Sequence, residues 1–264
     1  MHPLRLIPGL LAASPYSLRA MSSAVDAPSY VELPATSRHS ATVILLHGLG
    51  DSGNGLKPVA AHLQSQAGLG HCKFILPNAP IRPVTVNGNR LTPAWFNTRS
   101  FSPPSADFEE DQLHTLASIE KLIATELGAG PVTDPARIVV GGFSQGGVMS
   151  VLVGVVSEIR IAGIAVMSGR LPLRNAAMEF PRLKELASPH ASSLAVWWGH
   201  GLADEMLKVA FAETAVSFLT NEIGIPRDGK SGLVFRTYPG LGHGIGAEEM
   251  RDLGHWLEGI LPAE

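Results

Sequence analysis

The sequence has one cysteine, few aromatic residues, no excess of basic charge and no long hydrophobic run, and each shortage excludes a class of protein. Cys72 alone forms no intramolecular disulfide and no multi-cysteine zinc or iron–sulfur site, which fits a reducing compartment. The 20 Lys and Arg against 23 Asp and Glu leave a formal net charge of −3, so nucleic acid is not an expected partner. No stretch approaches the roughly 20 unbroken apolar residues that span a bilayer. We therefore expect a soluble protein without a metal site.

Length and composition favour one folded domain. The chain has 264 residues, 45% of them hydrophobic, which is enough to bury a single core. We place that domain at residues 40–264 and set residues 1–39 apart as an N-terminal tail that is disordered or has a targeting role. Residues 1–25 contain two Arg and no acidic residue, as a mitochondrial transit segment does. We expect a cytoplasmic location, with the nucleus as an additional site and mitochondria as the alternative, and Met21 offers a second start that bypasses the segment.

Short apolar runs alternate with longer helical patterns from residue 40 onward. The runs are almost entirely apolar, which is typical of strands buried on both faces of a parallel sheet, and their alternation with helices predicts βαβ crossovers. The expected fold class is α/β, with a mostly parallel central sheet, helices on both faces and no large cap domain. The expected strands are Thr42–Leu46, Lys73–Leu76, Arg137–Val140, Ile161–Met167, Ala195–Trp198 and Leu233–Tyr238, and the expected helices are Glu109–Leu127, Val148–Val156, Val209–Asn221 and Glu248–Leu261.

The loop after Arg137–Val140 contains Gly142-Phe-Ser144-Gln-Gly146 and leads into an apolar helix. Gly-x-Ser-x-Gly between a strand and a helix is typical of a serine nucleophile. The glycines let the strand and the helix pass closely, while the serine oxygen lies at the helix N-terminus, where backbone N–H groups receive negative charge. A chance match in a glycine-rich chain is the alternative, and the strand–turn–helix context argues against it. We predict Ser144 as the nucleophile.

A serine nucleophile needs a base and an orienting acid, which in such sheets follow in the order Ser, acid, His. Asp204 is the first acidic residue after the strand Ala195–Trp198; Glu205 is the neighbouring candidate, and an N-cap role for Asp204 is the alternative. Only His243 and His255 lie downstream of Asp204. His243 occupies a glycine-rich loop after a strand, whereas His255 points away from the apolar face of a helix. We predict Asp204 as the acid and His243 as the base.

A third glycine-rich loop, His47–Gly53, follows the first expected strand and satisfies Gly-x-Gly-x-x-Gly. A dinucleotide-binding oxidoreductase would need an acidic residue about 20 positions further on, but no Asp or Glu lies between Asp51 and Asp107. In a serine hydrolase, a loop in this place supplies an oxyanion N–H opposite the residue after the nucleophile. We therefore predict the backbone amides of Leu49 and Gln145 as oxyanion donors and expect no cofactor. The basic residues of the acid-free window permit at most transient contact with a membrane surface.

Seven motifs occur in order along roughly residues 40–262, and together they are far more specific than any one alone. They are His47-Gly-Leu-Gly-Asp-Ser-Gly, Leu76-Pro-Asn-Ala-Pro-Ile-Arg-Pro-Val-Thr, Pro93-Ala-Trp-Phe, Gly142-Phe-Ser-Gln-Gly-Gly, Ser168-Gly-Arg-Leu-Pro-Leu, His200-Gly-x-x-Asp204 and Tyr238-x-x-x-x-His243. In these motifs the chain resembles the acyl-protein thioesterase/lysophospholipase/carboxylesterase family of small α/β-hydrolases.

The resemblance implies an α/β-hydrolase fold, a triad of Ser144, Asp204 and His243, and the same two oxyanion donors. It further implies hydrolysis of long-chain acyl thioesters on protein cysteines, with weaker action on lysophospholipids and simple esters. The expected partners are therefore S-acylated proteins or acyl lipids, and the oligomeric state stays open. The expected groove for the acyl chain contains the apolar residues Leu91, Trp95, Phe96, Leu171 and Leu173.

The chain departs from the family pattern at four positions. Leu202 and Glu205 replace the first Asp and the Pro of His-Gly-Asp-x-Asp-Pro, Asn97 replaces an Asp after the Trp-Phe pair, and Arg170 stands where an aromatic residue is common. None removes a member of the triad, but all change the polarity around the site. Two alternatives therefore stay open: a carboxylesterase acting on a small-molecule ester, and a non-catalytic binding module on the same fold.

Overall fold

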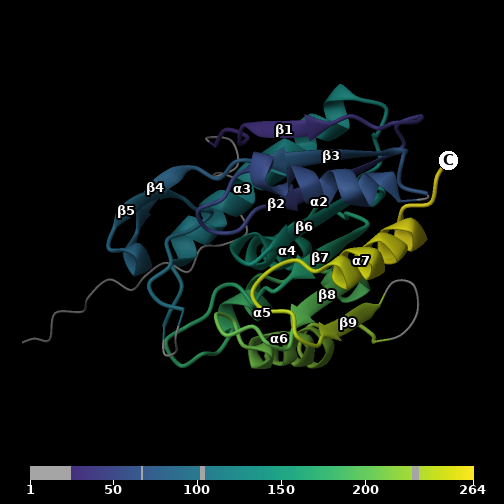
Figure 1. Cartoon of the computed structure of the whole chain (residues 1–264). Helices are drawn as coiled ribbons and strands as arrows, with labels where there is room; N and C mark the ends of the chain where they lie inside the picture. The colour runs from purple at the N-terminus through teal and green to yellow at the C-terminus, as the bar shows by residue number, and fades with distance from the viewer. Residues whose placement is uncertain (1–24, 67, 102–104, 228–231) are drawn as a thin grey trace, which may run out of the picture.

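The structure is a computed structural model that describes residues 25–66, 68–101, 105–227 and 232–264. Within these residues a seven-stranded sheet has the order β1-β3-β2-β6-β7-β8-β9 (Figure 1). Strand β1 is antiparallel to β3, and the other neighbouring pairs are parallel. The strands of this sheet are β1 (Tyr30–Leu33), β2 (Ala41–Leu46), β3 (Cys72–Pro77), β6 (Ile138–Phe143), β7 (Gly163–Met167), β8 (Ala195–Gly201) and β9 (Leu233–Tyr238), and a separate antiparallel hairpin consists of β4 (Ile81–Val84) and β5 (Arg90–Pro93).

Helices cover both faces of the sheet, which confirms the predicted α/β class (Figure 1). One face packs against α3 (Glu109–Ala129), α4 (Gln145–Val156), α5 (Pro181–Leu186) and α6 (Val209–Asn221), and the other against α2 (Gly53–Ser65) and α7 (Ala247–Ile260). Short 3₁₀ helices occur at Thr85–Asn87, Pro135–Arg137 and Ala191–Ser193. In the described part of the chain, no helix is long and apolar enough to cross a membrane.

All six expected strands and all four expected helices occur, with ends shifted by a few residues. The predicted domain boundary at residue 40 is too late for the sheet, because β1 pairs with β3 from Tyr30↔Pro77 to Leu33↔Phe74. Residues 1–24 of the expected targeting segment lie outside the described residues. Helix α2 was not expected, since it contains Gly55 and Pro58, which are poor helix formers.

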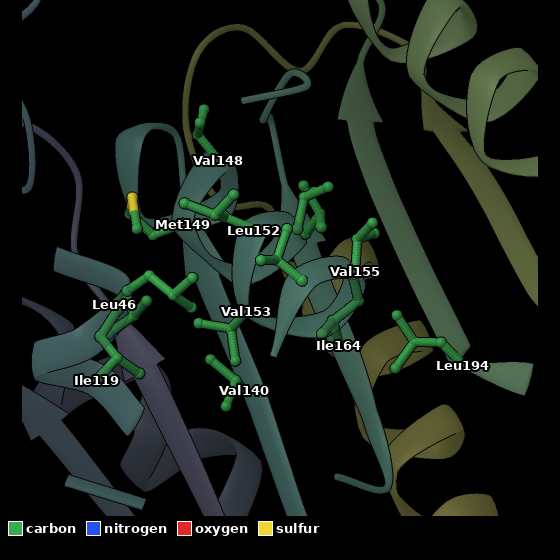
Figure 2. Packing of buried hydrophobic residues seen from close by; sticks show 14 of the residues in the cluster. Leu46, Ile119, Val140, Val148, Met149, Leu152, Val153, Val155, Ile164 and Leu194 are labelled. Atoms are coloured by element: carbon green, nitrogen blue, oxygen red, sulfur yellow. The ribbon is translucent and has the colours of Figure 1, made fainter. Parts of the chain in front are cut away.

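Helix α4 is the centre of the core and carries the nucleophile loop at its start. Every one of its 12 residues is buried, so it is apolar all round and lacks the one-sided pattern of a surface helix. Its Val153 side chain lies next to Val140 of β6 (Figure 2), and both belong to one cluster of buried hydrophobic residues. A Cβ at Gly154 would lie 2.7 Å from Ile164 Cγ2, so the missing side chain lets α4 approach β7 closely. The start of α4 is therefore held rigidly over the sheet.

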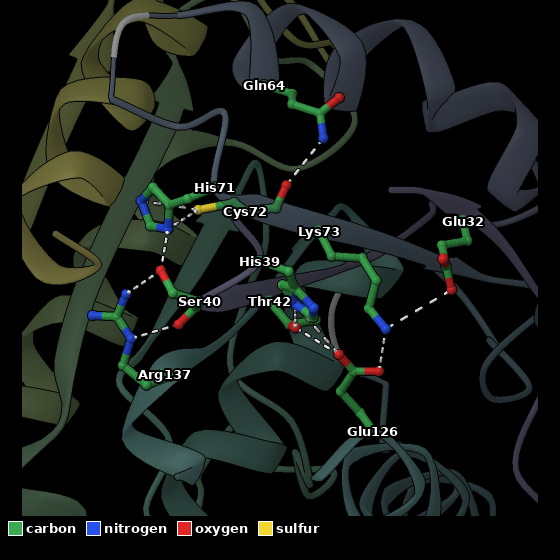
Figure 3. A network of polar contacts seen from close by, with 10 residues as sticks. All are labelled: Glu32, His39, Ser40, Thr42, Gln64, His71, Cys72, Lys73, Glu126 and Arg137. Atoms are coloured by element: carbon green, nitrogen blue, oxygen red, sulfur yellow. Dashed lines mark hydrogen bonds and ion pairs between the residues drawn. The ribbon is translucent and has the colours of Figure 1, made fainter. Parts of the chain in front are cut away.

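A buried carboxylate near the end of α3 ties that helix to two strands of the sheet (Figure 3). Glu126 is 5% exposed; it accepts a hydrogen bond from Thr42 Oγ1 at 2.7 Å and from Lys73 Nζ at 2.5 Å. Lys73 also lies 3.8 Å from Glu32 on β1. A charge removed from water is tolerated only when it is paired and hydrogen-bonded. Glu126 is satisfied in this way and links three strands to one helix.

We expect Glu126→Ala to lower the free energy of unfolding by about 3 kcal/mol, because it leaves Lys73 and Thr42 without their buried acceptor. Urea unfolding followed by circular dichroism measures the loss. Glu222→Ala is the matched control: Glu222 pairs with Lys184 at 2.6 Å, but both side chains are about half exposed, so its loss should stay below about 1 kcal/mol. Equal losses in the two variants would contradict the role given to burial.

Candidate active site

The turn between β6 and α4 places Ser144 in a backbone conformation that few side chains adopt. Its φ of 53° and ψ of −115° lie outside the regions favoured by L-residues, and its N–H donates to the carbonyl oxygen of Met167 at 2.9 Å. A Cβ at Gly142 would lie 2.4 Å from the carbonyl carbon of Gly146, and one at Gly146 would lie 2.0 Å from the carbonyl oxygen of Leu46. The two glycines of the motif are therefore required sterically.

The three residues predicted as a triad lie in one hydrogen-bonded line. His243 Nε2 is 2.9 Å from Ser144 Oγ, and His243 Nδ1 is 2.7 Å from Asp204 Oδ2. An ionised carboxylate only accepts hydrogen bonds, so Nδ1 of the neutral ring carries the proton and Nε2 is free to accept one from the serine. In contrast, Glu205 and His255, the neighbouring candidates, are exposed at the surface.

The Asp204 carboxylate is held by its own loop. Its side chain is fully buried, and Oδ1 accepts hydrogen bonds from the backbone N–H groups of Met206 at 3.0 Å and Leu207 at 2.8 Å. The N-cap of α6 is Lys208, so the alternative in which Asp204 caps that helix is wrong. One carboxylate oxygen therefore closes a turn, and the other faces His243.

A second buried histidine lies beside this carboxylate. His200 Nε2 is 2.6 Å from the carbonyl oxygen of Leu207, to which it donates, and 3.5 Å from Asp204 Oδ2. Burial lowers the pKa of His200, which keeps the ring neutral. A neutral ring leaves the negative charge of Asp204 available to His243. The position of His200 in His200-Gly-x-x-Asp204 was the available signal for this role, but sequence reasoning did not assign it.

The two residues predicted as oxyanion donors, Leu49 and Gln145, line the same cavity as Ser144. Gln145 is the first residue of α4, where the backbone N–H groups have no partner within the helix. The loop that carries Leu49 is fixed by His47: its Nε2 accepts from the N–H of Ala79 at 3.0 Å, and its Nδ1 donates to Gly48 at 2.7 Å. Burial lowers the pKa of His47, so the ring stays neutral.

The side chain of Gln145 has a role that the sequence did not reveal. Its Oε1 accepts from the N–H of Trp95 at 2.7 Å, and its Nε2 donates to the carbonyl oxygen of Phe96 at 2.7 Å and to Thr98 Oγ1 at 3.2 Å. The Trp95 ring in turn donates from Nε1 to the carbonyl oxygen of His47 at 2.8 Å. These contacts hold the segment that follows β5 against the loop of His47 and the first turn of α4.

Residues 29–261 match the phospholipase/carboxylesterase family. The chain belongs to this family. It is 38% identical to acyl-protein thioesterase 1 of Mycosarcoma maydis over 85% of this chain and 93% of that one, and 33% identical to acyl-protein thioesterase 1 of Yarrowia lipolytica over 86% and 95%. Among solved structures, Arabidopsis thaliana SOBER1 is similar with a TM-score of 0.74 and 27% identity, and the match covers 84% of this chain and 99% of that one. Zea mays acyl-protein thioesterase 2 is similar with a TM-score of 0.70 and 25% identity, over 89% of this chain and 99% of that one.

This family member is a serine hydrolase. A cavity of about 30 Å³ lies next to Ser144. Of the residues expected to form an acyl groove, Phe96 lines the cavity, whereas Leu91 is 72% exposed on the β4–β5 hairpin. The other three expected residues lie in the hydrophobic core and not at the cavity, since an apolar side chain is buried as favourably in a core as in a groove. These three are Trp95, Leu171 and Leu173. The described residues that line the cavity are Leu49, Phe96, Thr98, Ser100, Phe101, Ser144, Gln145, Val148, Arg170 and Leu207.

A buried acid supports the loop that carries the base of this hydrolase. Glu249, in the first turn of α7, is fully buried, and its Oε2 accepts from the N–H of Gly246 at 3.2 Å. Its Oε1 has no partner within the described residues and lies where a Cβ at Gly199 would reach it at 2.4 Å. Burial raises the pKa of Glu249 to about 7, and the bond from Gly246 opposes this only in part.

We expect Gly146→Ala to reduce kcat/KM for p-nitrophenyl acetate by about 100-fold and to cost about 2 kcal/mol of stability, because the new Cβ displaces the first turn of α4 from Leu46. Steady-state kinetics and urea unfolding check the two effects. Gly128→Ala, at a position in α3 with nothing within 4 Å of the new Cβ, should leave kcat/KM unchanged and should not lower the free energy of unfolding. Wild-type kinetics in Gly146→Ala would show that the close approach is not needed.

The raised pKa of Glu249 predicts that stability falls as the pH rises. Between its ordinary pKa of 4.5 and about 7, the folded chain keeps a proton that the unfolded chain releases, so the free energy of unfolding decreases across this window and stays lower above it. Glu249→Gln keeps an acceptor for Gly246 and does not titrate. It should be about 3 kcal/mol more stable than the wild type at pH 8.5 and equal to it at pH 4. Urea unfolding at both values checks this, and a difference independent of pH would contradict it.

Proposed function

We propose that this hydrolase cleaves long-chain acyl thioesters of protein cysteines through Ser144, His243 and Asp204, with weaker action on lysophospholipids and simple esters. The hydrogen-bonded line from Asp204 through His243 to Ser144 carries the proposal. The relatives named acyl-protein thioesterases support the substrate class.

In the first half of the reaction, Ser144 Oγ attacks the acyl carbonyl carbon while His243 Nε2 takes the serine proton. Asp204 stabilises the imidazolium that forms and keeps the ring in the required orientation. The negative charge of the tetrahedral intermediate falls on the oxygen that faces the backbone amides of Leu49 and Gln145. Each such donor typically contributes about 3 kcal/mol to the stabilisation of this charge.

In the second half, the intermediate collapses and the cysteine sulfur leaves as a thiol with the proton that His243 Nε2 returns to it, so His243 is neutral again. A thiol pKa of about 8.5 makes this leaving group better than an amine or an alcohol, so the demand on His243 as an acid is modest. Water then attacks the acyl-enzyme with His243 as base, and release of the fatty acid restores Ser144. The full cycle uses the side chains of this chain and water.

A carboxylesterase acting on small esters is the second candidate function. It is favoured by the cavity of about 30 Å³ beside Ser144, which accommodates a small group but not a long acyl chain in the observed conformation. If the protein is a long-chain thioesterase, the acyl chain of the substrate has to lie outside this cavity or widen it. The two candidates share the reaction and the residues, and differ in the length of the acyl group.

We expect a fluorophosphonate probe to label the wild type and not Ser144→Ala, because the probe reacts only with an activated serine. Ser217→Ala, which changes an exposed serine on α6, should label as the wild type does. In-gel fluorescence measures the labelling. Folded wild-type protein that fails to label would favour a non-catalytic binding module.

Turnover of S-acyl peptides with chains of about 2 to 16 carbons separates the two candidate functions. The thioesterase proposal predicts that kcat/KM rises with chain length, because longer chains bury more apolar surface. A preference for the shortest ester or thioester would overturn the long-chain proposal in favour of the second candidate.

A further inference from the structure

Arg170 is the one charged side chain among the described residues that line the cavity beside Ser144. It follows β7 and replaces the aromatic residue that the resemblance led us to expect. Its side chain is 8% exposed, and the guanidinium carbon lies 5.9 Å above the centre of the Phe96 ring. A guanidinium in a small and mostly apolar space is costly unless it meets an anion there.

The contacts of Arg170 leave part of its hydrogen-bonding capacity unused. Nη1 donates to Asp107 Oδ2 at 2.9 Å and to the carbonyl oxygen of Leu171 at 2.8 Å, and Nη2 donates to Asp107 Oδ1 at 2.6 Å. A guanidinium carries five N–H groups. These contacts within the described part of the chain use three of them, so two remain for a ligand.

The charge around Asp107 is also unbalanced. Arg174 is 3% exposed, its Nη2 lies 3.9 Å from Asp107 Oδ1, and its Nε has no partner within the described residues. Burial and the nearby Arg170 lower the pKa of Arg174 to about 10, so it is still charged at neutral pH. Two buried cations therefore share one carboxylate, and the cluster carries an excess positive charge beside the cavity.

We propose that Arg170 makes this cavity selective for a substrate that carries a carboxylate close to the bond that is cleaved. This inference rests on the proposed function of Ser144 and adds the substrate's charge to it. A carboxylate that enters the cavity accepts the two remaining N–H groups of Arg170 and balances the excess charge of the cluster. The carboxylate belongs either to the acyl group, as in a dicarboxylic half-thioester, or to the leaving group.

Two pairs of thioesters test the proposal and distinguish these sources. In the first pair, S-glutaryl-N-acetylcysteamine carries the carboxylate on the acyl side, and S-valeryl-N-acetylcysteamine is its neutral counterpart. In the second pair, S-valeryl-3-mercaptopropionate carries it on the leaving group, and the methyl ester of that compound is neutral. We expect the wild type to prefer the anionic member of one pair by about tenfold in kcat/KM, which is typical of a hydrogen-bonded charge pair.

Variants connect the preference to Arg170. In Arg170→Gln the ratio of anionic to neutral kcat/KM should fall about tenfold, and Arg170→Lys should restore part of it. Asp107 keeps its contacts with Arg174 in both variants, and thermal unfolding reports whether each folds. Arg160→Gln removes the same charge from an exposed position and should leave the ratio unchanged.

The outcomes separate failure of this inference from failure of the proposed function. If the wild type does not prefer the anionic thioester in either pair, the inference is overturned without any variant. A preference that persists in folded Arg170→Gln overturns it as well. If Arg170→Gln does not fold, a preference in folded Arg170→Lys that equals that of the wild type overturns the inference, because an ammonium group lacks the paired N–H donors of the guanidinium. Wild-type protein that hydrolyses neither neutral thioester overturns the proposed function instead.

Discussion

The close approach of α4 to the end of β2 is the constraint on which the site depends. The backbone of Gly146 passes so near the carbonyl oxygen of Leu46 that no side chain fits between them. This contact fixes the distance between the loop after β2 and the first turn of α4. Both predicted oxyanion amides and the strained serine lie on these two segments, so one glycine contact sets the geometry of all three. The fully buried α4 behind them makes the contact rigid.

The sheet and the catalytic candidates were predictable because they depend on local patterns. Buried parallel strands are apolar throughout, and the residues of a Gly-x-Ser-x-Gly turn must follow such a strand. The order of elements then restricts Asp204 and His243 to the loops after later strands, and the structure places Asp204 and Ser144 within hydrogen-bond distance of the His243 ring. Helix α2 and strand β1 lacked such patterns: the first contains Gly and Pro, and the second is a short edge strand with two exposed residues.

The groove was not predictable, because hydrophobicity alone does not distinguish a core residue from a residue that lines a cavity. Leu171 and Leu173 satisfy both descriptions in the sequence, yet the structure buries both in the hydrophobic core. The polar contacts of Gln145 and Arg170 were equally hidden, since each joins segments far apart in the chain. Their partners become visible only when the sheet brings the loops together at one edge.

Gln145 illustrates how one residue serves two otherwise separate tasks. Its main-chain amide is a predicted oxyanion donor, while its side chain forms hydrogen bonds with the backbone on either side of the Trp95–Phe96 peptide bond. A displacement of the Trp95–Phe96 backbone therefore displaces Gln145, and with it the backbone N–H that is predicted to bind the oxyanion. Substitutions in residues 95–98 can thus change the rate of the reaction without any change in the triad. Since Phe96 and Thr98 also line the cavity, the same substitutions change which substrates fit.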